Sequence, residues 1–150
     1  MLALAMALIG CDNTRVYEIN HDFDNAVWRA GDTVTFEFVI QDTSRRYNVI
    51  LNVRNTIDFE TVRLFANYEL TDPAGIKIRK RLVEQNLFDR KTGEPFGDSG
   101  LRDIYAHQFV LEPSIKFASG PYKVKLSHMM RPDELKEILS VGIRVELVNK

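Results

Sequence analysis

The residues of this 150-residue chain best suited to chemistry are one cysteine, three histidines and several loop carboxylates. Cys11 directly follows ten residues that contain no charged side chain and no proline, ending in Leu8-Ile9-Gly10. This pattern matches the bacterial lipobox, in which a signal peptidase cleaves before a cysteine whose thiol carries diacylglycerol. We therefore predict cleavage between Gly10 and Cys11, and lipidation of Cys11 with diacylglycerol and an N-acyl chain, palmitate included.

The apolar leader itself departs from a standard signal peptide. Such peptides have a positively charged start and about 15 to 30 residues, yet no Lys or Arg precedes Arg15. We expect residues 1–10 to be a partial lipoprotein signal peptide and residues 11–150 to form a single domain. Ten apolar residues are too few to span a bilayer, which takes about 20, so the expected membrane attachment is the lipid.

The histidines give little support for an enzyme. His21, His107 and His128 show neither HxH nor HxxxH spacing, and a single cysteine excludes an internal disulfide and a Cys-based zinc site. The patterns GxSxG, GxxxxGK and GxGxxG are missing. We expect no catalytic residue, no bound metal and no small-molecule cofactor. A hydrolase would need a cleft that joins His107 or His128 to a carboxylate and a nucleophile.

A second group of candidates lies in a polar loop and beside a strand. The loop at residues 89–103 carries four carboxylates, those of Asp89, Glu94, Asp98 and Asp103. Oxygen ligands of this kind could hold Ca²⁺, but the EF-hand spacing is missing and solvated loop residues are the preferred interpretation. Trp28, the only tryptophan, could stack on a sugar or pack in the core. The candidate ligand or partner surface comprises Trp28, Asp98, Asp103 and His107.

Composition limits the classes of partner. Twenty basic and 21 acidic residues give a formal charge of −1, so bulk composition supplies no basic surface for nucleic acid. Hydrophobic residues at 45% and charged residues at 27% are typical of a globular domain. The densest basic run is Lys77, Arg79, Lys80 and Arg81, which we interpret as an exposed strand face that protects a sheet edge.

The elements that position these candidates are strands, because apolar residues recur with period two. In residues 33–40, Val34, Phe36, Phe38 and Ile40 share one face. Similar runs occur at 47–55, 64–70, 76–82, 104–111, 122–129 and 141–148. Polar residues at 42–46 and the sequence Asp72-Pro73-Ala74-Gly75 are typical of hairpin turns.

The spacing of these runs leaves no room for helical crossovers. We predict an all-β fold, an antiparallel two-sheet β-sandwich of jelly-roll or Ig-like type with about eight strands. One short helix is expected near the C-terminal end, from Pro132 to Leu139, with proline in its first turn.

Taken in order, short motifs along nearly the whole mature chain resemble the GldH gliding-motility lipoproteins of the Bacteroidetes. The similar segments are Cys11 to Glu18, Asp22-Phe23, Trp28, Phe36 to Asp42, Tyr47-Asn48, Val53 to Asn55, Leu64-Phe65, Pro73 to Gly75, Gly97 to Tyr105, Gly120 to Tyr122, Met130-Arg131 and Val141 to Val145. The resemblance implies a lipid-anchored protein that acts with other envelope lipoproteins in gliding and is linked to type IX secretion. It carries over no catalytic residue; Cys11 is the functional residue that transfers.

The resemblance also indicates a location. In this phylum an acidic residue near the lipidated cysteine favours the outer membrane, and Asp12 follows Cys11. The expected function is that of a non-enzymatic cell-envelope component that binds other motility or envelope lipoproteins. The alternative is a glycan-binding β-sandwich module, which would use Trp28 and the loop around Asp98.

Overall fold

The computed structural model describes residues 12–149, and its regular structure is almost entirely antiparallel strand. One turn of 3₁₀-helix, η1 (Asp24–Ala26), interrupts the strands. The strands are β1 (Arg15–Asp22), β2 (Val27–Arg29), β3 (Val34–Ile40), β4 (Tyr47–Thr56), β5 (Arg63–Thr71), β6 (Lys77–Asn86), β7 (Asp98–Ser99), β8 (Ile104–Ile115), β9 (Gly120–His128), β10 (Glu134–Lys136) and β11 (Ile138–Leu147).

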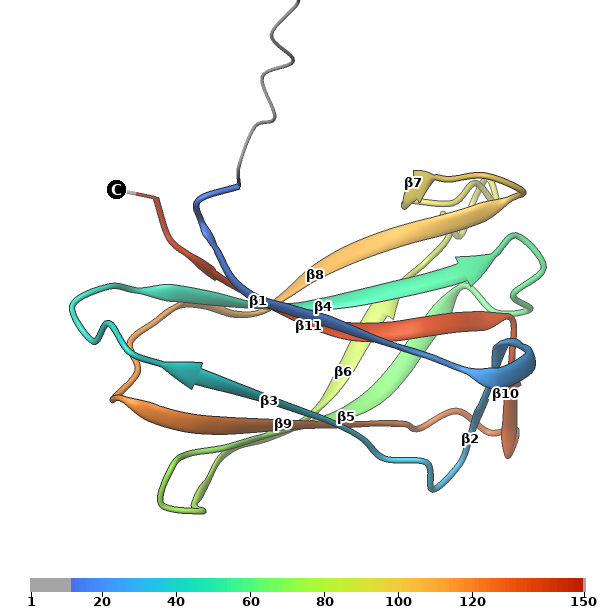
Figure 1. Cartoon of the computed structure of the whole chain (residues 1–150). Coiled ribbons are helices and arrows are strands. Elements are labelled where there is room, and N and C mark those ends of the chain that lie inside the picture. The colour runs from blue at the N-terminus through green and yellow to red at the C-terminus, as the bar shows by residue number, and fades with distance from the viewer. Residues whose placement is uncertain (1–11, 150) are drawn as a thin grey trace, which may run out of the picture.

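Two main sheets face each other in a sandwich (Figure 1). The first has the strand order β1-β11-β4-β8-β7, and the second has the order β3-β9-β5-β6. A small third sheet pairs β10 with β2 at one end of the sandwich. Because β3 and β4 are consecutive in sequence but lie in different sheets, the chain crosses between layers after Ile40.

Alternating side chains of both sheets build one apolar core. In β3, Val34, Phe36, Phe38 and Ile40 are buried, whereas the residues between them are exposed. Val141, Ile143 and Val145 of β11 are fully buried on the opposite sheet. Each such side chain contributes about 1.5–3 kcal/mol on burial, so the two inner faces hold the layers together.

Side chains also close the two open sides of the sandwich. On one side the ring of Tyr17 in β1 lies 5.9 Å from that of Phe38 in β3. On the other, Arg79 Nε of β6 lies 3.4 Å from the Glu112 carboxylate of β8. Arg81 of β6 donates to the backbone carbonyl of Leu111. The basic residues of β6 therefore join the two sheets at the edge of the second one, as well as covering it.

The strand predictions are largely confirmed. The seven predicted runs correspond to β3, β4, β5, β6, β8, β9 and β11. The turn at Asp72 to Gly75 does connect a hairpin, since β5 pairs with β6. The segment 42–46 does not, because β3 pairs with β9 and β4 pairs with β8 and β11.

The predicted helix from Pro132 to Leu139 is wrong. Residues Glu134–Lys136 form β10, and β11 begins at Ile138 after Glu137, whose φ is +69°. Leu135 is buried and pairs with Trp28 of β2. An eight-residue segment has little helical stability of its own, so a neighbouring strand edge determines its conformation.

Within residues 12–149, no helix is long and apolar enough to cross a membrane. The chain enters the sandwich at the end where β1 begins and β11 finishes, since Arg15 pairs with Glu146. β1 finishes at the opposite end, beside the start of β11. With strands of eight to ten residues rising about 3.3 Å per residue, the two ends lie roughly 30 Å apart.

Candidate functional site

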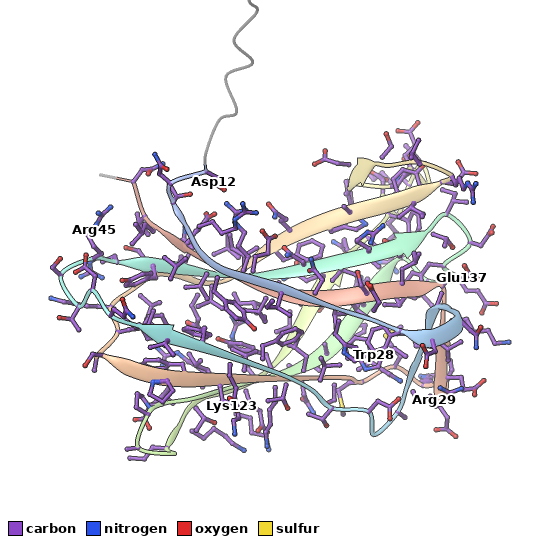
Figure 2. The ribbon with its side chains drawn as sticks, in the orientation of Figure 1. Asp12, Trp28, Arg29, Arg45, Lys123 and Glu137 are labelled. Carbon is purple, nitrogen blue, oxygen red and sulfur yellow. The ribbon has the colours of Figure 1, made fainter. Side chains whose placement is uncertain are left out.

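The predicted lipidation site lies just outside the described residues. Gly10 and Cys11 precede Asp12, the first residue that the structure describes, so the predictions of cleavage and lipidation there stay predictions. Two residues beyond Asp12 the chain is already part of the fold, because Leu147 donates its backbone N–H to the Thr14 carbonyl at 2.8 Å. Figure 2 shows Asp12 and Arg45 in the half of the sandwich away from Arg29 and Glu137.

Arg144 in β11 connects Asp12, the first described residue, to the sheet. Its guanidinium contacts three carboxylates: it pairs with Asp12, lies 3.3 Å from Glu18 Oε2 and lies 2.8 Å from Glu146 Oε2. The Arg144 side chain is only 14% exposed, so these contacts are better shielded from solvent than ordinary surface pairs. Asn52 donates to the Glu18 carboxylate as well, at 2.9 Å.

These contacts shift the titration of the carboxylates. A hydrogen bond from the Thr14 hydroxyl, followed by one from Arg144, holds the Asp12 pKa well below its ordinary value. Burial raises the Glu18 pKa, but hydrogen bonds from Arg15 and Asn52 and the charge of Arg144 outweigh burial, so the pKa is lowered overall. Both carboxylates are therefore charged at neutral pH and bind Arg144 in that state.

Further along β1, two residues before the strand ends, the pairing with β11 depends on a close approach of the two backbones. Gly142 pairs with Asn20, and a Cβ atom added to Gly142 would lie 1.9 Å from Asn20 Oδ1 and 2.6 Å from the Ile19 backbone oxygen. Only glycine leaves room for the Asn20 side chain, which accepts a hydrogen bond from Asn52 at 3.2 Å. Gly142 thus positions the strand that follows the predicted anchor.

The structure does not support Trp28 as a sugar-stacking platform. Its side chain is fully buried, and its ring stacks on Phe23 at 5.2 Å and meets His128 edge-on at 5.4 Å. The indole N–H donates to the Asp32 carbonyl at 3.0 Å. Trp28 of β2 therefore fills the core at this end of the sandwich, and its buried ring offers no surface on which a sugar could stack.

His107 and Asp98 are brought together, but not in a catalytic geometry. His107 is 4% exposed, and its Nε2 lies 2.8 Å from Oδ1 of the buried Asn55. Burial lowers the His107 pKa, and the charge of Asp98 opposes that shift only in part. Gly97 packs so closely that an added Cβ would lie 2.8 Å from the imidazole ring. His107 is thus a buried residue that organises the loop before β8.

Of the loop carboxylates, that of Asp89 stabilises a local turn. Asp89 Oδ1 accepts the backbone N–H groups of Lys91 at 2.7 Å and Thr92 at 3.0 Å. Asp98 and Asp103 are exposed. The backbone carbonyl of Asp103 accepts a hydrogen bond from the Ile57 backbone N–H at 2.9 Å. In the part of the chain from 12 to 149, no three His, Cys, Asp or Glu side chains gather in a way that could hold a metal ion.

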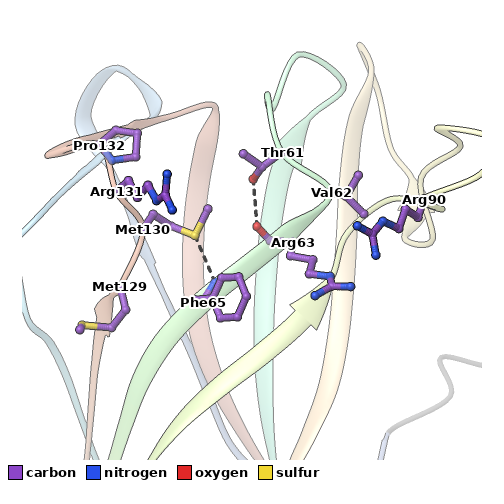
Figure 3. A pocket seen from close by; sticks show the side chains of 9 residues that line it. All are labelled: Thr61, Val62, Arg63, Phe65, Arg90, Met129, Met130, Arg131 and Pro132. Carbon is purple, nitrogen blue, oxygen red and sulfur yellow. Dashed lines mark hydrogen bonds between the residues drawn. The ribbon is translucent and has the colours of Figure 1, made fainter.

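A groove of about 780 Å³ opens at the end of the sandwich opposite Asp12. Three separate segments form it: the start of β5 with the residues before it, the loop after β6, and the residues between β9 and β10 (Figure 3). Its lining residues are Thr61, Val62, Arg63, Phe65, Arg90, Met129, Met130, Arg131 and Pro132. An adjoining hollow of about 250 Å³ continues it along Phe59, Met130 and Leu135.

Hydrogen bonds hold the walls of this groove together. Phe65 donates its backbone N–H to the Met130 sulfur at 3.3 Å, and Met129 donates its backbone N–H to the Phe65 carbonyl at 2.8 Å. The Thr61 hydroxyl donates to the Arg63 carbonyl at 2.9 Å. The groove therefore presents three guanidinium groups around an apolar surface, a chemistry suited to an anionic partner with apolar side chains.

Sequence reasoning did not find this groove. In the sequence, Met130 and Arg131 stand out only as one of the segments that resemble a known family. No pattern in the sequence indicates a role for Arg63 or Arg90. A signal is present in Met129-Met130-Arg131-Pro132, where exposed apolar and basic residues follow a strand. That signal becomes specific only when the fold adds Arg63 and Arg90 from elsewhere.

The described part of the chain is an all-β domain, and Asp12, which follows the predicted lipidation site, is already paired with its sheet. This layout fits the body of a lipoprotein. A family model described as GldH lipoprotein matches residues 15–145. The chain belongs to this family of lipoproteins.

Two curated relatives cover nearly its whole length. The Gliding motility lipoprotein GldH of Flavobacterium johnsoniae is 25% identical over 156 residues, spanning 97% of this chain and 93% of that protein. The Gliding motility lipoprotein GldH homolog of Christiangramia forsetii is 30% identical over 144 residues, spanning 91% of this chain and 86% of that protein.

Solved structures show more distant similarity. The infectious bursal disease virus Gx strain structure is 18% identical with a TM-score of 0.46, over 90% of this chain and 32% of that chain. The family GH115 4-O-methyl-alpha-glucuronidase BtGH115A is 14% identical with a TM-score of 0.47, over 99% of this chain and 20% of that chain.

Proposed function

We propose that this protein is a lipid-anchored, non-enzymatic component of the gliding motility machinery, associated with type IX secretion, that acts by binding other envelope proteins. The observation that carries the proposal is the family match over residues 15–145, together with two near-full-length relatives named for gliding motility. The partners are other envelope or motility lipoproteins. Nucleic acid, metal and small-molecule cofactors play no part in the proposed function.

The anchor in this proposal is Cys11, in the outer membrane. Two features support it: Cys11 follows an apolar leader, and the acidic Asp12 comes next. The ion pair between Asp12 and Arg144 would leave a very short tether between the acylated cysteine and the β-sandwich. The domain would then stay close to the bilayer, with its opposite end facing away from the anchor.

The anchor is tested by Cys11→Ser in the native host. Because the core lies beyond the leader, we expect the variant to move into the soluble fraction while its melting temperature stays unchanged. Asn13→Ser, two residues further on, is the matched control and should remain with the membrane. Membrane association of Cys11→Ser equal to that of the control would contradict a lipid anchor at this position.

The binding function is tested by mild crosslinking of intact cells, followed by recovery of the tagged full-length protein. We expect envelope proteins of the motility apparatus to be recovered, and we expect cells that lack the gene to lose colony spreading. If crosslinking recovers no envelope protein and spreading is unchanged, the proposal is wrong. If binding persists without any effect on spreading, the gliding part of the proposal is wrong.

A further inference from the structure

We propose that the groove between β5, the loop after β6 and the β9–β10 connection binds an extended acidic segment of a partner protein, in which carboxylates flank an apolar side chain. This inference rests on the proposed protein-binding function and names the chemistry of the partner. Its starting point is the lining itself, which contains three arginines and no carboxylate.

The charges of the groove are available to a partner. Arg63 lies 2.7 Å from the Glu84 carboxylate and is thereby partly neutralised. Arg90 and Arg131 are exposed and form no ion pair with any residue between 12 and 149. A guanidinium binds a carboxylate through two parallel hydrogen bonds. Two such groups on opposite walls, from separate loops (Figure 3), suit a ligand with two carboxylates.

The floor of the groove explains why the ligand also carries an apolar side chain. Val62, Phe65, Met130 and Pro132 line it, and Met129 is 54% exposed at its rim. Unbranched methionines adapt to different apolar shapes, as they do at surfaces that bind peptides. The adjoining hollow extends the groove beyond Met130 along Phe59 and Leu135, and its lining also includes Glu60, Glu134 and Lys136. This added length favours an extended segment over a compact ion, with the carboxylates of the ligand at the arginines of the main groove.

The same lining argues against a glycan. The hydroxyls of a neutral sugar both donate and accept hydrogen bonds, whereas guanidinium groups only donate. The lining contains no carboxylate and no side-chain amide, and its one hydroxyl, that of Thr61, already donates to the Arg63 carbonyl. No aromatic ring other than that of Phe65 lines the groove, and Trp28 is buried.

A lipid surface fits less well than a protein segment. The groove lies at the end of the sandwich opposite Asp12, and strands of this length place it roughly 30 Å from that residue. It is therefore distant from the proposed anchor. The potential of an anionic membrane decays over a Debye length of about 8–10 Å. The three arginines therefore face a partner that approaches from the side away from the anchoring bilayer.

The first experiment places a photoreactive benzoylphenylalanine at Met129 of the full-length protein in living cells, and at Lys116 as a control at the other end. We expect an envelope-protein adduct from position 129 only. The crosslinked peptide, identified by mass spectrometry, should contain at least two Asp or Glu residues beside an apolar residue. Absence of an adduct, the same adduct from position 116, or a crosslinked peptide without acidic residues would overturn the inference.

The second experiment measures binding of that mapped segment as a synthetic fluorescent peptide by anisotropy. Arg90→Glu/Arg131→Glu should weaken binding at least about tenfold, since charge reversal adds repulsion to the lost ion pairs. Arg90→Lys/Arg131→Lys should retain more affinity than the Glu variant. Lys116→Glu/Lys125→Glu alters net charge equally, away from the groove, and should bind like wild type. Equal losses in both charge-reversed proteins would show a non-specific charge effect and overturn the groove assignment.

Two controls keep the outcomes distinct. Circular dichroism melts verify that each variant is folded before binding is compared. Phosphatidylglycerol vesicles test the lipid alternative, and vesicle binding by the Cys11→Ser protein that disappears in Arg90→Glu/Arg131→Glu would overturn the peptide assignment. If whole-protein crosslinking recovers envelope partners while position 129 yields no adduct, this inference fails and the proposed function stands.

Discussion

At the end of the sandwich where β1 begins, Arg144 is 14% exposed and contacts three carboxylates. At the opposite end, Arg90 and Arg131 are exposed beside an apolar groove and pair with no carboxylate among residues 12–149. Charges that are paired and shielded stabilise the native state, whereas exposed charges on loops contribute little to it. One end of the sandwich thus has its charges paired with one another, as suits the proposed anchor, and the other leaves two arginines unpaired among residues 12–149, as suits the proposed partner groove.

The largest expected change in the free energy of unfolding comes from the buried core at the groove end, not from the arginines there. Trp28→Ala should lower the free energy of unfolding by about 3–5 kcal/mol, the usual cost of removing a buried aromatic residue. Urea denaturation followed by circular dichroism measures this change. Tyr105→Ala, at a half-buried aromatic position on β8, is a milder control. A loss below about 1 kcal/mol for Trp28→Ala would show that the ring does not hold this end together.

The next effect tests edge strand β1, which runs from the end near Asp12 to the groove end. Gly142→Ala should cost about 3 kcal/mol, because its Cβ would displace both Asn20 Oδ1 and the Ile19 carbonyl and separate β1 from β11. Hydrogen exchange should show faster exchange in β1 than in β4. Gly100→Ala, whose Cβ would meet only the Ile104 carbonyl at 3.3 Å, should change stability far less. Similar losses for the two variants would remove the special role given to the β1–β11 contact.

A smaller, pH-dependent effect is expected at Arg144. Arg144→Met should cost about 1 kcal/mol at pH 7 by removing charged hydrogen bonds to Glu18 and Glu146. The folded-state pKa of Glu18 is depressed below its ordinary 4.5, so the stabilisation is fully present above that value. It is lost as the pH falls through the folded-state pKa.

Thermal melts from pH 3 to pH 8 check this dependence. The stability difference between wild type and Arg144→Met should shrink as the solution is acidified below about pH 4.5, the ordinary Glu18 pKa. Lys116→Met, which removes an exposed cation at the same end, should show no such dependence. A difference that stays constant down to pH 3 would contradict the role of the charged carboxylates.

The smallest effect belongs to the groove. Arg90→Glu/Arg131→Glu should change the free energy of unfolding by less than about 0.5 kcal/mol, as for other exposed substitutions, while the binding described above is lost. Urea denaturation at low and high salt measures the stability. A destabilisation equal to that of Arg144→Met would show that these arginines support the fold, and the contrast between the two ends would disappear.

The accuracy of the strand predictions followed local pattern. β3 and β9 alternate buried and exposed residues almost without interruption, and such periodicity is visible without any partner. β1 was missed because it is an edge strand with only two half-buried residues. The 132–139 segment was misassigned because its proline suggested a helix start, whereas its conformation depends on pairing with β2.

The site predictions divide in the same way. The anchor at Cys11 is a prediction from ten contiguous residues and stays one. The sequence left Trp28 open between a core residue and a sugar platform, because its burial also depends on Leu135 and His128, more than 90 residues further along the chain. The groove combines residues near 63, 90 and 130, and no local pattern relates three segments so far apart.

The sequence by itself determined the all-β class and the inner faces of the long strands, because both follow from the side-chain period of neighbouring residues. The predicted lipobox also rests on neighbouring residues alone. Only the tertiary structure decided that β3 and β4 lie in different sheets, that Arg144 gathers carboxylates from 126 and 132 residues away, and that Arg90 and Arg131 share a groove. Those outcomes depend on which strand edges meet and which charges find partners. Such pairings are long-range, and their energies are settled only once the two sheets have packed.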